Sequence, residues 1–351
     1  MIIPSFKAKG GIASLVDGYR GSELENAFQI HYIETYCDGG KIAKFCKAVT
    51  AYAAFLRELL FSRPDLVHIH SAFSASFFRK VPFVYLSVLL GIPVINHIHG
   101  SELEQFYLNA SSLKKQFIRA TYNRCTKIIV LSEQWKEQFS CLVPADRLAV
   151  VVNYSSLQSP APDASVRSAR PQILYLGFLS ERKGCFDIPE IAATVCREID
   201  DAEFVLGGAG KDEGVQQILS LAEKYNVSER LLFPGWVKDE QKDSLLRSAA
   251  LYFLPSYSEG MPMSILEAMG YGLPVVSTTV GGIPAIVREG ENGYLCSPGN
   301  CSALAHAIVR ILKNPDLRNA MSQRSLEIIR DHYTKDCHIG KLIELYNTLL
   351  S

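Results

Sequence analysis

The strongest constraint on the fold is an alternation of short apolar runs with longer helical patterns along the chain. The short runs suit buried strands, and the amphipathic segments between them suit helices that cross from one strand to the next. Such a series is typical of an α/β protein with a doubly wound parallel sheet. The predicted strands are residues 66–70, 94–97, 127–131 and 148–152, followed by 173–176, 204–206, 231–233, 251–254 and 275–277.

A polar segment divides this series into two halves. Residues 155–171 are rich in Ser, Pro, Ala, Asp and Arg, a composition that predicts a linker. The chain has 351 residues, which is more than one hydrophobic core usually serves. We therefore expect an N-terminal domain over residues 1–160 and a C-terminal domain over residues 171–335.

Composition narrows the class of protein and its compartment. The 36 basic and 36 acidic side chains give no net charge, which disfavours a nucleic-acid partner. No segment reaches the roughly 20 apolar residues that a membrane-spanning helix needs. Residues 1–7 lack the pattern of a signal peptide and are short for a first strand. The nine cysteines include no Cys-x-x-Cys pair, which indicates free thiols in a reducing compartment, the cytoplasm.

Two acidic residues flank a predicted helix start in the second half. Glu259 lies on a Gly-x-Pro loop, and Glu267 lies about one turn inside the helix that follows. The amide N–H groups at a helix start lack partners and carry the positive end of the dipole, so the gap between the acids suits a phosphate. A buried strand and the Gly281-Gly282 turn come next, as expected at the binding edge of a parallel sheet. The alternative is a pair of ordinary solvated glutamates.

This run resembles the Glu-x7-Glu signature of retaining glycosyltransferases of family 4, which have the GT-B fold. The resemblance implies two Rossmann-like, doubly wound parallel-sheet domains that face each other across a cleft. It also implies that the final helix, residues 336–351, packs back on the N-terminal domain; otherwise it is simply a last helix of the second domain.

The implied activity is a metal-independent, retaining transfer in cell-surface polysaccharide synthesis. A hexose or N-acetylhexosamine moves from a nucleotide-diphosphate sugar to a glycan, a lipid-linked saccharide or a small acceptor. A UDP-sugar is favoured as the donor co-substrate, a GDP-sugar is possible, and no cofactor or metal is expected.

The resemblance assigns roles on the donor side. Lys183, in a Lys-Gly pair after the strand 173–176, holds the leaving diphosphate, and Arg182 supplies a second cation because Phe178 occupies the position of the family's arginine. Glu259 holds the donor sugar and Glu267 binds the ribose. The remaining donor-binding positions offer backbone amides to the diphosphate or the base, and they are Gly10, Gly11, Gly260, Met261, Met263, Gly235 and Val237. Ala285 replaces an acid that is usual in the family.

The acceptor side has a glycine loop and two His-x-His pairs. Gly10 and Gly11 resemble the family's N-terminal glycine loop, where backbone amides approach a phosphate or a sugar. His99, in a His-Gly pair after a strand, matches the histidine that touches the transferred sugar. His68, His70 and His97 are then core or strand-end histidines.

Two other classes of protein remain open. Alternate strand residues share a face, so His-x-His pairs can chelate a metal, as in a metal-dependent hydrolase. The missing arginine and acid of the family pattern would suit a non-catalytic nucleotide-sugar binding protein.

A basic segment predicts a possible surface partner. Residues 112–126 form an amphipathic helical pattern with four basic side chains and no acid. Such a helix can rest on an anionic membrane in peripheral contact, or it can be a solvated face of the core. The Arg79-Lys80 pair similarly suits either an anionic acceptor or the solvent.

Overall fold

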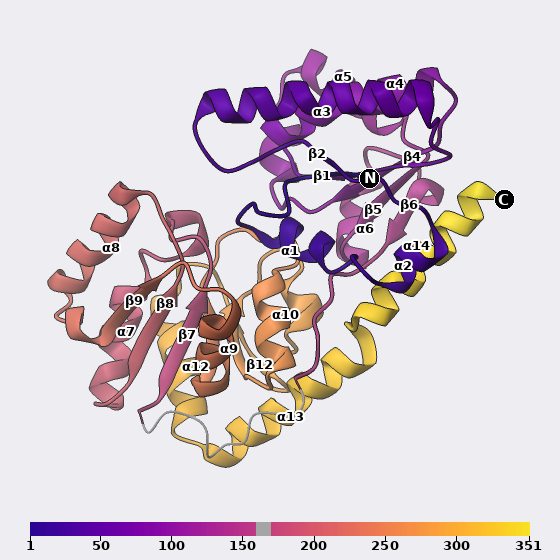
Figure 1. The fold of residues 1–351 in the computed structure, drawn as a ribbon. Helices are drawn as coiled ribbons and strands as arrows, with labels where there is room; N and C mark the ends of the chain where they lie inside the picture. The colour runs from indigo at the N-terminus through magenta and orange to yellow at the C-terminus, as the bar shows by residue number, and fades with distance from the viewer. Residues whose placement is uncertain (159–169) are drawn as a thin grey trace. The chain divides into compact units, whose positions relative to one another are not determined.

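The computed structural model describes residues 1–158 and 170–351, so most of the predicted linker lies outside the described residues. The chain forms two compact units, each built around a parallel sheet (Figure 1). The N-terminal unit consists of Met1–Asn153 and Lys335–Ser351, and the C-terminal unit consists of Tyr154–Thr334.

The N-terminal unit contains six parallel strands in the order β2-β1-β3-β4-β5-β6. β2 lies on one side of β1 and β3 to β6 follow in sequence on the other side, so the strand order reverses between β1 and β3. In such sheets a crevice opens outside the carboxyl ends of the strands at the point of reversal. The strands are β1 (Ile2–Ile3), β2 (Ile33–Glu34), β3 (Val67–Ser71), β4 (Val94–Ile98), β5 (Lys127–Val130) and β6 (Leu148–Val150).

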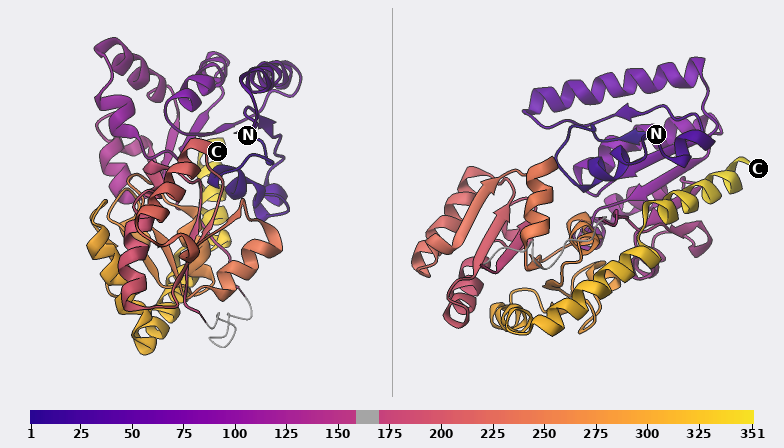
Figure 2. Two further views of the ribbon diagram at one scale, coloured as in Figure 1. Left: turned by 90° about the vertical axis from the view of Figure 1, so that its left-hand side faces the viewer. Right: turned by 60° about the horizontal axis from the view of Figure 1, so that its bottom comes forward.

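Helices cover both faces of this sheet because successive residues of each strand point to opposite sides. Val67 and Ile69 of β3 join the main hydrophobic core with side chains of α3, α4, α5 and α6. His68 and His70 of the same strand point to the opposite side, where Tyr346 of α14 bonds to His68. The helices of this unit are α1 (Gly11–Asp17), α2 (Glu23–Ala27), α3 (Lys41–Phe61), α4 (Ala75–Leu89), α5 (Ser112–Tyr122), α6 (Glu133–Phe139) and α14 (Lys335–Leu350). The long α3 helix runs along the outside of the unit (Figure 2).

The C-terminal unit contains a second sheet of six parallel strands, in the order β12-β11-β10-β7-β8-β9. Here the order reverses between β7 and β10, which is the Rossmann arrangement. The strands are β7 (Gln172–Leu176), β8 (Glu203–Gly207), β9 (Leu231–Gly235), β10 (Leu251–Leu254), β11 (Val275–Thr278) and β12 (Gly293–Cys296). The helices are α7 (Ile188–Glu198), α8 (Asp212–Lys224), α9 (Asp239–Ser248), α10 (Met263–Gly270), α11 (Ile283–Ile286), α12 (Cys301–Leu312) and α13 (Pro315–His332).

The predicted fold class, two doubly wound parallel sheets, is confirmed, and all nine predicted strands are present with ends that differ by one or two residues. Three further strands, β1, β2 and β12, are not among these nine: β1 and β2 have only two residues each, and β2 and β12 lie at the edges of the sheets. The predicted helix 112–126 is too long, since α5 ends at Tyr122 and a turn leads from Asn123 into β5. Within the described residues, no helix combines the length and the apolar character needed to cross a membrane.

Candidate functional site

An ion pair joins the two loops at the point where the C-terminal sheet reverses its order. The Lys183 Nζ atom, on the loop after β7, lies 2.5 Å from Glu259 Oε1, on the loop after β10. Both side chains are largely buried, with 18% of Lys183 and 7% of Glu259 exposed. A charge-assisted bond of this length places a cation and an anion in fixed positions at the carboxyl edge of the sheet.

The backbone around Arg182 ties the same two loops together. The Tyr257 N–H and the Ser256 hydroxyl donate to the Arg182 carbonyl oxygen at 2.9 Å and 3.2 Å. In return, Arg182 Nη1 donates to the Ser258 carbonyl oxygen at 3.0 Å. Gly184 completes the contact, because its φ is 71° and a Cβ atom there would lie 1.9 Å from the Pro255 carbonyl oxygen. Only glycine fits at that position.

The Gly281-Gly282 turn packs directly against the loop that carries Glu259. Gly281 has a φ of 56°, and an added Cβ atom would lie 1.6 Å from the Glu259 carbonyl oxygen. The Gly282 N–H donates to the Gly260 carbonyl oxygen at 2.6 Å. Both glycines are therefore required by a close approach of two backbones, and that approach positions Glu259.

The start of α10 has no side-chain cap, and Glu267 projects one turn inside the helix. The N-cap residue is Pro262, which offers no side-chain acceptor to the amides of the first turn, including that of Met263. These donors and the helix dipole suit an anionic group. Glu267 Oε1 lies 3.1 Å from the Nζ atom of Lys242, on α9. Lys242 was not predicted as a site residue, because no local pattern marks it and only the fold brings α9 beside α10.

Glycine-rich loops complete this edge of the C-terminal sheet. A Cβ atom on Gly208 would lie 1.8 Å from the Gly177 carbonyl oxygen, so the loops after β7 and β8 touch. Gly235 ends β9 with a φ of 78°, and Val237 packs on Gly207. Behind them, the buried Tyr252 hydroxyl donates to the Leu176 carbonyl oxygen at 3.0 Å, and burial raises the pKa of Tyr252 above its usual range. Apart from Gly10 and Gly11, which lie in the N-terminal unit, the predicted donor-binding residues thus lie on neighbouring loops and helix starts of the C-terminal unit.

His99 and the glycine loop lie in the N-terminal unit. His99 directly follows β4, and its Nε2 atom lies 2.9 Å from His70 Nδ1. Burial, and then the charge of His338, lower the pKa of His99 to about 3, so its ring is neutral at physiological pH. Gly10 precedes α1 with a φ of 143°, and an added Cβ atom would meet nothing within 4 Å. The backbone conformation, rather than lack of space, therefore favours glycine at Gly10.

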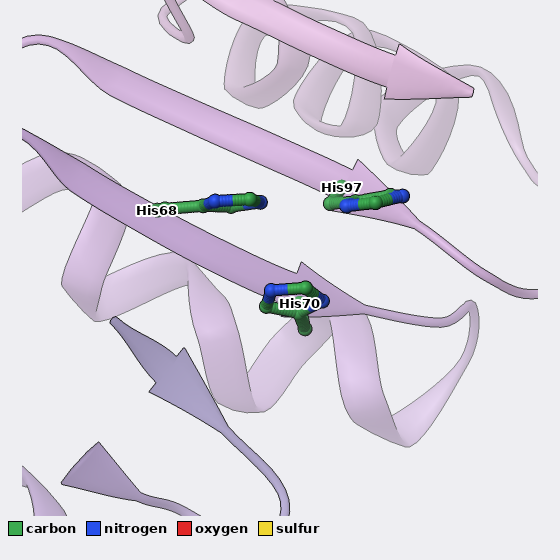
Figure 3. A group of neighbouring side chains, drawn as sticks. All are labelled: His68, His70 and His97. Carbon is green, nitrogen blue, oxygen red and sulfur yellow. The ribbon is translucent and has the colours of Figure 1, made fainter. Parts of the chain in front are cut away.

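The other three histidines, His68, His70 and His97, form a histidine cluster within the N-terminal unit (Figure 3). One nitrogen atom from each ring lies within 4.8 Å of the others, and all three side chains are almost fully buried. Burial is the main cause that lowers the pKa of each ring well below its ordinary value. The rings are therefore neutral, and they stack with centroids 4.4 Å apart between His68 and His70.

The histidine cluster does not favour the metal-dependent hydrolase. A hydrolytic metal needs an open coordination position for water and substrate. The three side chains are at most 2% exposed, and no carboxylate joins the cluster in the described part of the chain. The interpretation of His68, His70 and His97 as core residues therefore agrees with their burial.

Two family models match the chain. Residues 15–154 match the model "Glycosyltransferase Family 4", and residues 162–327 match the model "Glycosyl transferases group 1". The first match lies in the N-terminal unit except for its last residue, 154, and the second match falls within the C-terminal unit, Tyr154–Thr334. Together the two models span most of the sequence.

The chain is also similar to curated relatives and to solved structures. The chain is 23% identical over 296 residues to N-acetyl-alpha-D-glucosaminyl L-malate synthase of Bacillus anthracis, covering 81% of this chain and 74% of the relative. It is 25% identical over 345 residues to the UDP-Gal:alpha-D-GlcNAc-diphosphoundecaprenol alpha-1,3-galactosyltransferase of Escherichia coli, covering 92% and 84%. The fold resembles that of Anabaena Alr3699/HepE in complex with UDP-glucose, with a TM-score of 0.75 at 17% identity, covering 99% and 91%.

Proposed function

This chain is a glycosyltransferase with the GT-B fold, and we propose that it transfers a hexose or an N-acetylhexosamine from a UDP-sugar with retention of configuration. The observation that carries the proposal is the ion pair of Lys183 and Glu259 beside the uncapped start of α10. A cation, an acid and a helix start without a side-chain cap, at one sheet edge, suit the diphosphate and the sugar of such a donor.

The proposed roles on the donor follow from the charges of the site. Lys183 and Arg182 neutralise the diphosphate as it leaves, together with the amides of the loop Gly260–Met261 and of Met263. Glu259 accepts hydrogen bonds from hydroxyl groups of the donor sugar. Because these groups are already held by neighbouring loops, little reorganisation is needed when the donor binds.

The other predicted residues are proposed to bind the nucleoside end of the donor. Glu267 accepts hydrogen bonds from the ribose, and Lys242 orients the Glu267 carboxylate through their 3.1 Å contact. The backbone of Gly235 and Val237 lies at the end of β9, where it can bind the base. UDP is favoured because the Escherichia coli relative is named for UDP-Gal and the Anabaena structure holds UDP-glucose. GDP is the alternative.

The proposed chemistry requires no metal ion. The bond between the anomeric carbon and the diphosphate breaks, and the acceptor hydroxyl attacks the same face of the sugar. The departing diphosphate oxygen takes the proton of that hydroxyl. His99, neutral because its pKa is lowered to about 3, stabilises positive charge at the anomeric carbon through its backbone or ring. The Gly10-Gly11 loop offers backbone amides to a phosphate or a sugar.

The acceptor is proposed to be a glycan, a lipid-linked saccharide or a small molecule in cell-surface polysaccharide synthesis. The name of the Escherichia coli relative, which acts on a diphosphoundecaprenol-linked sugar, supports a lipid-linked saccharide. Nine free cysteines support a reducing compartment, so we place the reaction on the cytoplasmic side of the membrane.

We also propose peripheral membrane contact through an apolar–basic face on α3, α4 and α5. Among the described residues, 19 large hydrophobic side chains are exposed and 13 of them lie between residues 42 and 117, so exposed apolar surface is concentrated on these helices and their connections. On α5, Leu113 is 80% exposed and Phe117 is 39% exposed. Basic residues accompany them, and Lys114, Lys115, Arg119 and Arg124 belong to the predicted segment 112–126. Such a combination suits an anionic bilayer surface.

The test of the proposed function is a screen of donors with the purified chain. UDP-, GDP- and ADP-sugars are compared for the rise in melting temperature, since a ligand that binds only the native state stabilises it. The account expects a UDP-sugar to give the largest rise and to be slowly hydrolysed or transferred. A non-catalytic binding protein would show stabilisation without turnover. No stabilisation by any nucleotide sugar would overturn the proposal.

A further inference from the structure

A pocket of about 270 Å³ opens at the carboxyl edge of the N-terminal sheet. Its walls include Pro4 after β1, Thr35 and Tyr36 after β2, and His70 of β3. This is the point where the strand order reverses, between β1 and β3, and such positions bind ligands in open α/β sheets. The pocket lies entirely within the N-terminal unit.

Two neighbouring cations of α4, Arg79 and Lys80, line this pocket. Lys80 is only 3% exposed, and its ammonium group donates to the Thr35 hydroxyl. That hydroxyl already donates to the Ile3 carbonyl oxygen at 2.9 Å, so it acts toward Lys80 as an acceptor. An ammonium group has three donors, so one bond to Thr35 leaves the others for a ligand. The buried Nε atom of Arg79 has no hydrogen-bond partner in the structure.

No acid of the described residues forms an ion pair with either of these two cations. Over residues 1–158 and 170–351, no carboxylate is recorded within ion-pair distance of Arg79 or Lys80. Burial, and then the adjacent Arg79 charge, hold the pKa of Lys80 well below its usual range. A buried cation without a partner destabilises a fold, and proteins retain such groups mainly where they serve a ligand.

We propose that this pocket binds an anionic group, a phosphate or a carboxylate, of the acceptor substrate. The proposal rests on the proposed transferase function, and it adds the chemical class of the acceptor. Lys80 and Arg79 supply the charge, and Thr35 orients the Lys80 ammonium group. One histidine links the pocket to the chemistry, since His70 borders it and bonds to His99 at 2.9 Å.

Arg79 and Lys80 suit an anionic group of the acceptor better than one of the donor. The donor diphosphate already has the cations Lys183 and Arg182 in the C-terminal unit. A second pair of cations on another sheet, without acids of their own, matches a second anion. The two sources differ in one measurable respect: an acceptor anion and UDP bind together, whereas a donor phosphate and UDP compete.

The experiment measures binding of inorganic phosphate to the full chain by thermal stabilisation and calorimetry, at constant ionic strength set with chloride. Phosphate is expected to stabilise the wild-type chain, with and without saturating UDP. Lys80→Met is expected to weaken phosphate binding by about 10- to 100-fold, the loss typical of charge-assisted hydrogen bonds. Arg79→Gln, at a less buried position, is expected to weaken it in the same direction. The exposed Lys341→Met, on α14 of the same unit, serves as the matched control.

A second readout separates binding from a structural role. Lys80→Met removes a buried charge, so the ligand-free variant is expected to melt at a higher temperature than the wild type. Equal stabilisation of wild type and both variants by phosphate, or no stabilisation of any, would overturn the proposal. Competition between UDP and the part of the phosphate binding that is lost in Lys80→Met would assign the pocket to the donor and overturn the acceptor assignment. Phosphate binding without any nucleotide-sugar binding would instead remove the transferase function and leave the anion site.

Discussion

Lys183 and Glu259 are 76 residues apart in the sequence, yet their charged groups lie 2.5 Å from each other. The distance is short because β7 and β10 are neighbours in the C-terminal sheet and each is followed by a loop at the same edge. The strand order therefore brings a cation and an acid together at the place where open α/β sheets bind ligands. Several independent contacts hold the two loops, so the pair is formed before any donor arrives.

Loss of the cation is expected to affect turnover more than the fold. Lys183→Met removes charge from the leaving diphosphate and is expected to lower kcat by about 10²- to 10³-fold. It also leaves Glu259 without its partner, at a cost of about 1–3 kcal/mol in the free energy of unfolding. Steady-state kinetics and urea unfolding measure the two effects, with the exposed Lys224→Met as the matched control.

The double variant Lys183→Met/Glu259→Gln tests whether these effects belong to one pair. Its stability loss is expected to be smaller than the sum of the single losses, because neither group is left charged and unpaired. Activity is expected to stay low. Strictly additive losses of stability would contradict a direct interaction.

Gly281→Ala tests the contact between the backbones of Gly281 and Glu259. The new Cβ atom would lie 1.6 Å from the Glu259 carbonyl oxygen, so the acid loop must move, and donor binding is expected to weaken by at least about tenfold. Gly290→Ala is the control, since Gly290 also has a positive φ, 75°, but open space around it. Both variants carry backbone strain of about 1 kcal/mol. Only Gly281→Ala adds the clash, and equal donor affinity in the two variants would contradict the assigned contact.

The buried histidines are expected to make the N-terminal unit sensitive to acid. Burial lowers the pKa of His338 from 6.5 to about 4, so below pH 6.5 the unfolded chain binds a proton that the folded chain does not. Stability is therefore full above pH 6.5 and falls as the pH drops toward 4, by about 3 kcal/mol for this residue. The free energy of unfolding, measured in urea between pH 7.5 and 5, is expected to fall steeply.

A single substitution can reduce that slope. His338→Gln removes one of the titrating groups, and its unfolding free energy is expected to depend less on pH than that of the wild type. The exposed His306→Gln is the control. An identical pH dependence in all three proteins would show that His338 does not contribute.

The apolar–basic face predicts binding to anionic vesicles. The full chain is expected to sediment with phosphatidylglycerol vesicles at low salt, and less at high salt because the attraction is screened. Lys115→Gln is expected to weaken binding about fivefold, near 1 kcal/mol for one basic residue. Leu113→Ser removes an apolar contact with the bilayer. The control is Lys238→Gln, because the Lys238 side chain is 78% exposed and lies in the C-terminal unit. Equal sedimentation with uncharged phosphatidylcholine vesicles would contradict an electrostatic contact.

Metal independence has a direct test. Dialysis against EDTA is expected to leave the transfer rate unchanged, because Lys183, Arg182 and helix amides supply the positive charge. Elemental analysis of the purified chain accompanies the assay. A rate lost with EDTA and restored by one divalent ion would contradict this part of the mechanism.

Much of the fold could be predicted because the strands and turns of a parallel sheet each leave a pattern in a short stretch of sequence. Most of the buried strands are apolar runs, and some are followed by a turn with glycine, as at Gly177 after β7 and Gly208 after β8. The acids of the C-terminal unit were also found from local pattern, since Glu259 and Glu267 flank one helix start. The two-residue strands β1 and β2 and the edge strand β12 were not predicted.

The partners of these residues could not be predicted. Lys242 reaches Glu267 only because α9 and α10 lie beside each other, and Lys80 becomes a buried cation only through the packing of α4 on β3. The burial of His68, His70 and His97 likewise depends on α14, which comes more than 230 residues later in the chain. Contacts between distant segments are set by the assembled core and leave no local pattern.

The central claim is that a nucleotide diphosphate binds at the carboxyl edge of the C-terminal sheet, between Glu259 and Glu267. Calorimetric titration of UDP into the full chain tests it, with Lys183→Met, Glu267→Gln and the exposed control Glu240→Gln. The account predicts that the wild type and the control bind UDP alike, and that each site variant binds at least about tenfold more weakly. Equal affinity in all four proteins, or no binding of either UDP or GDP by the wild type, would contradict it.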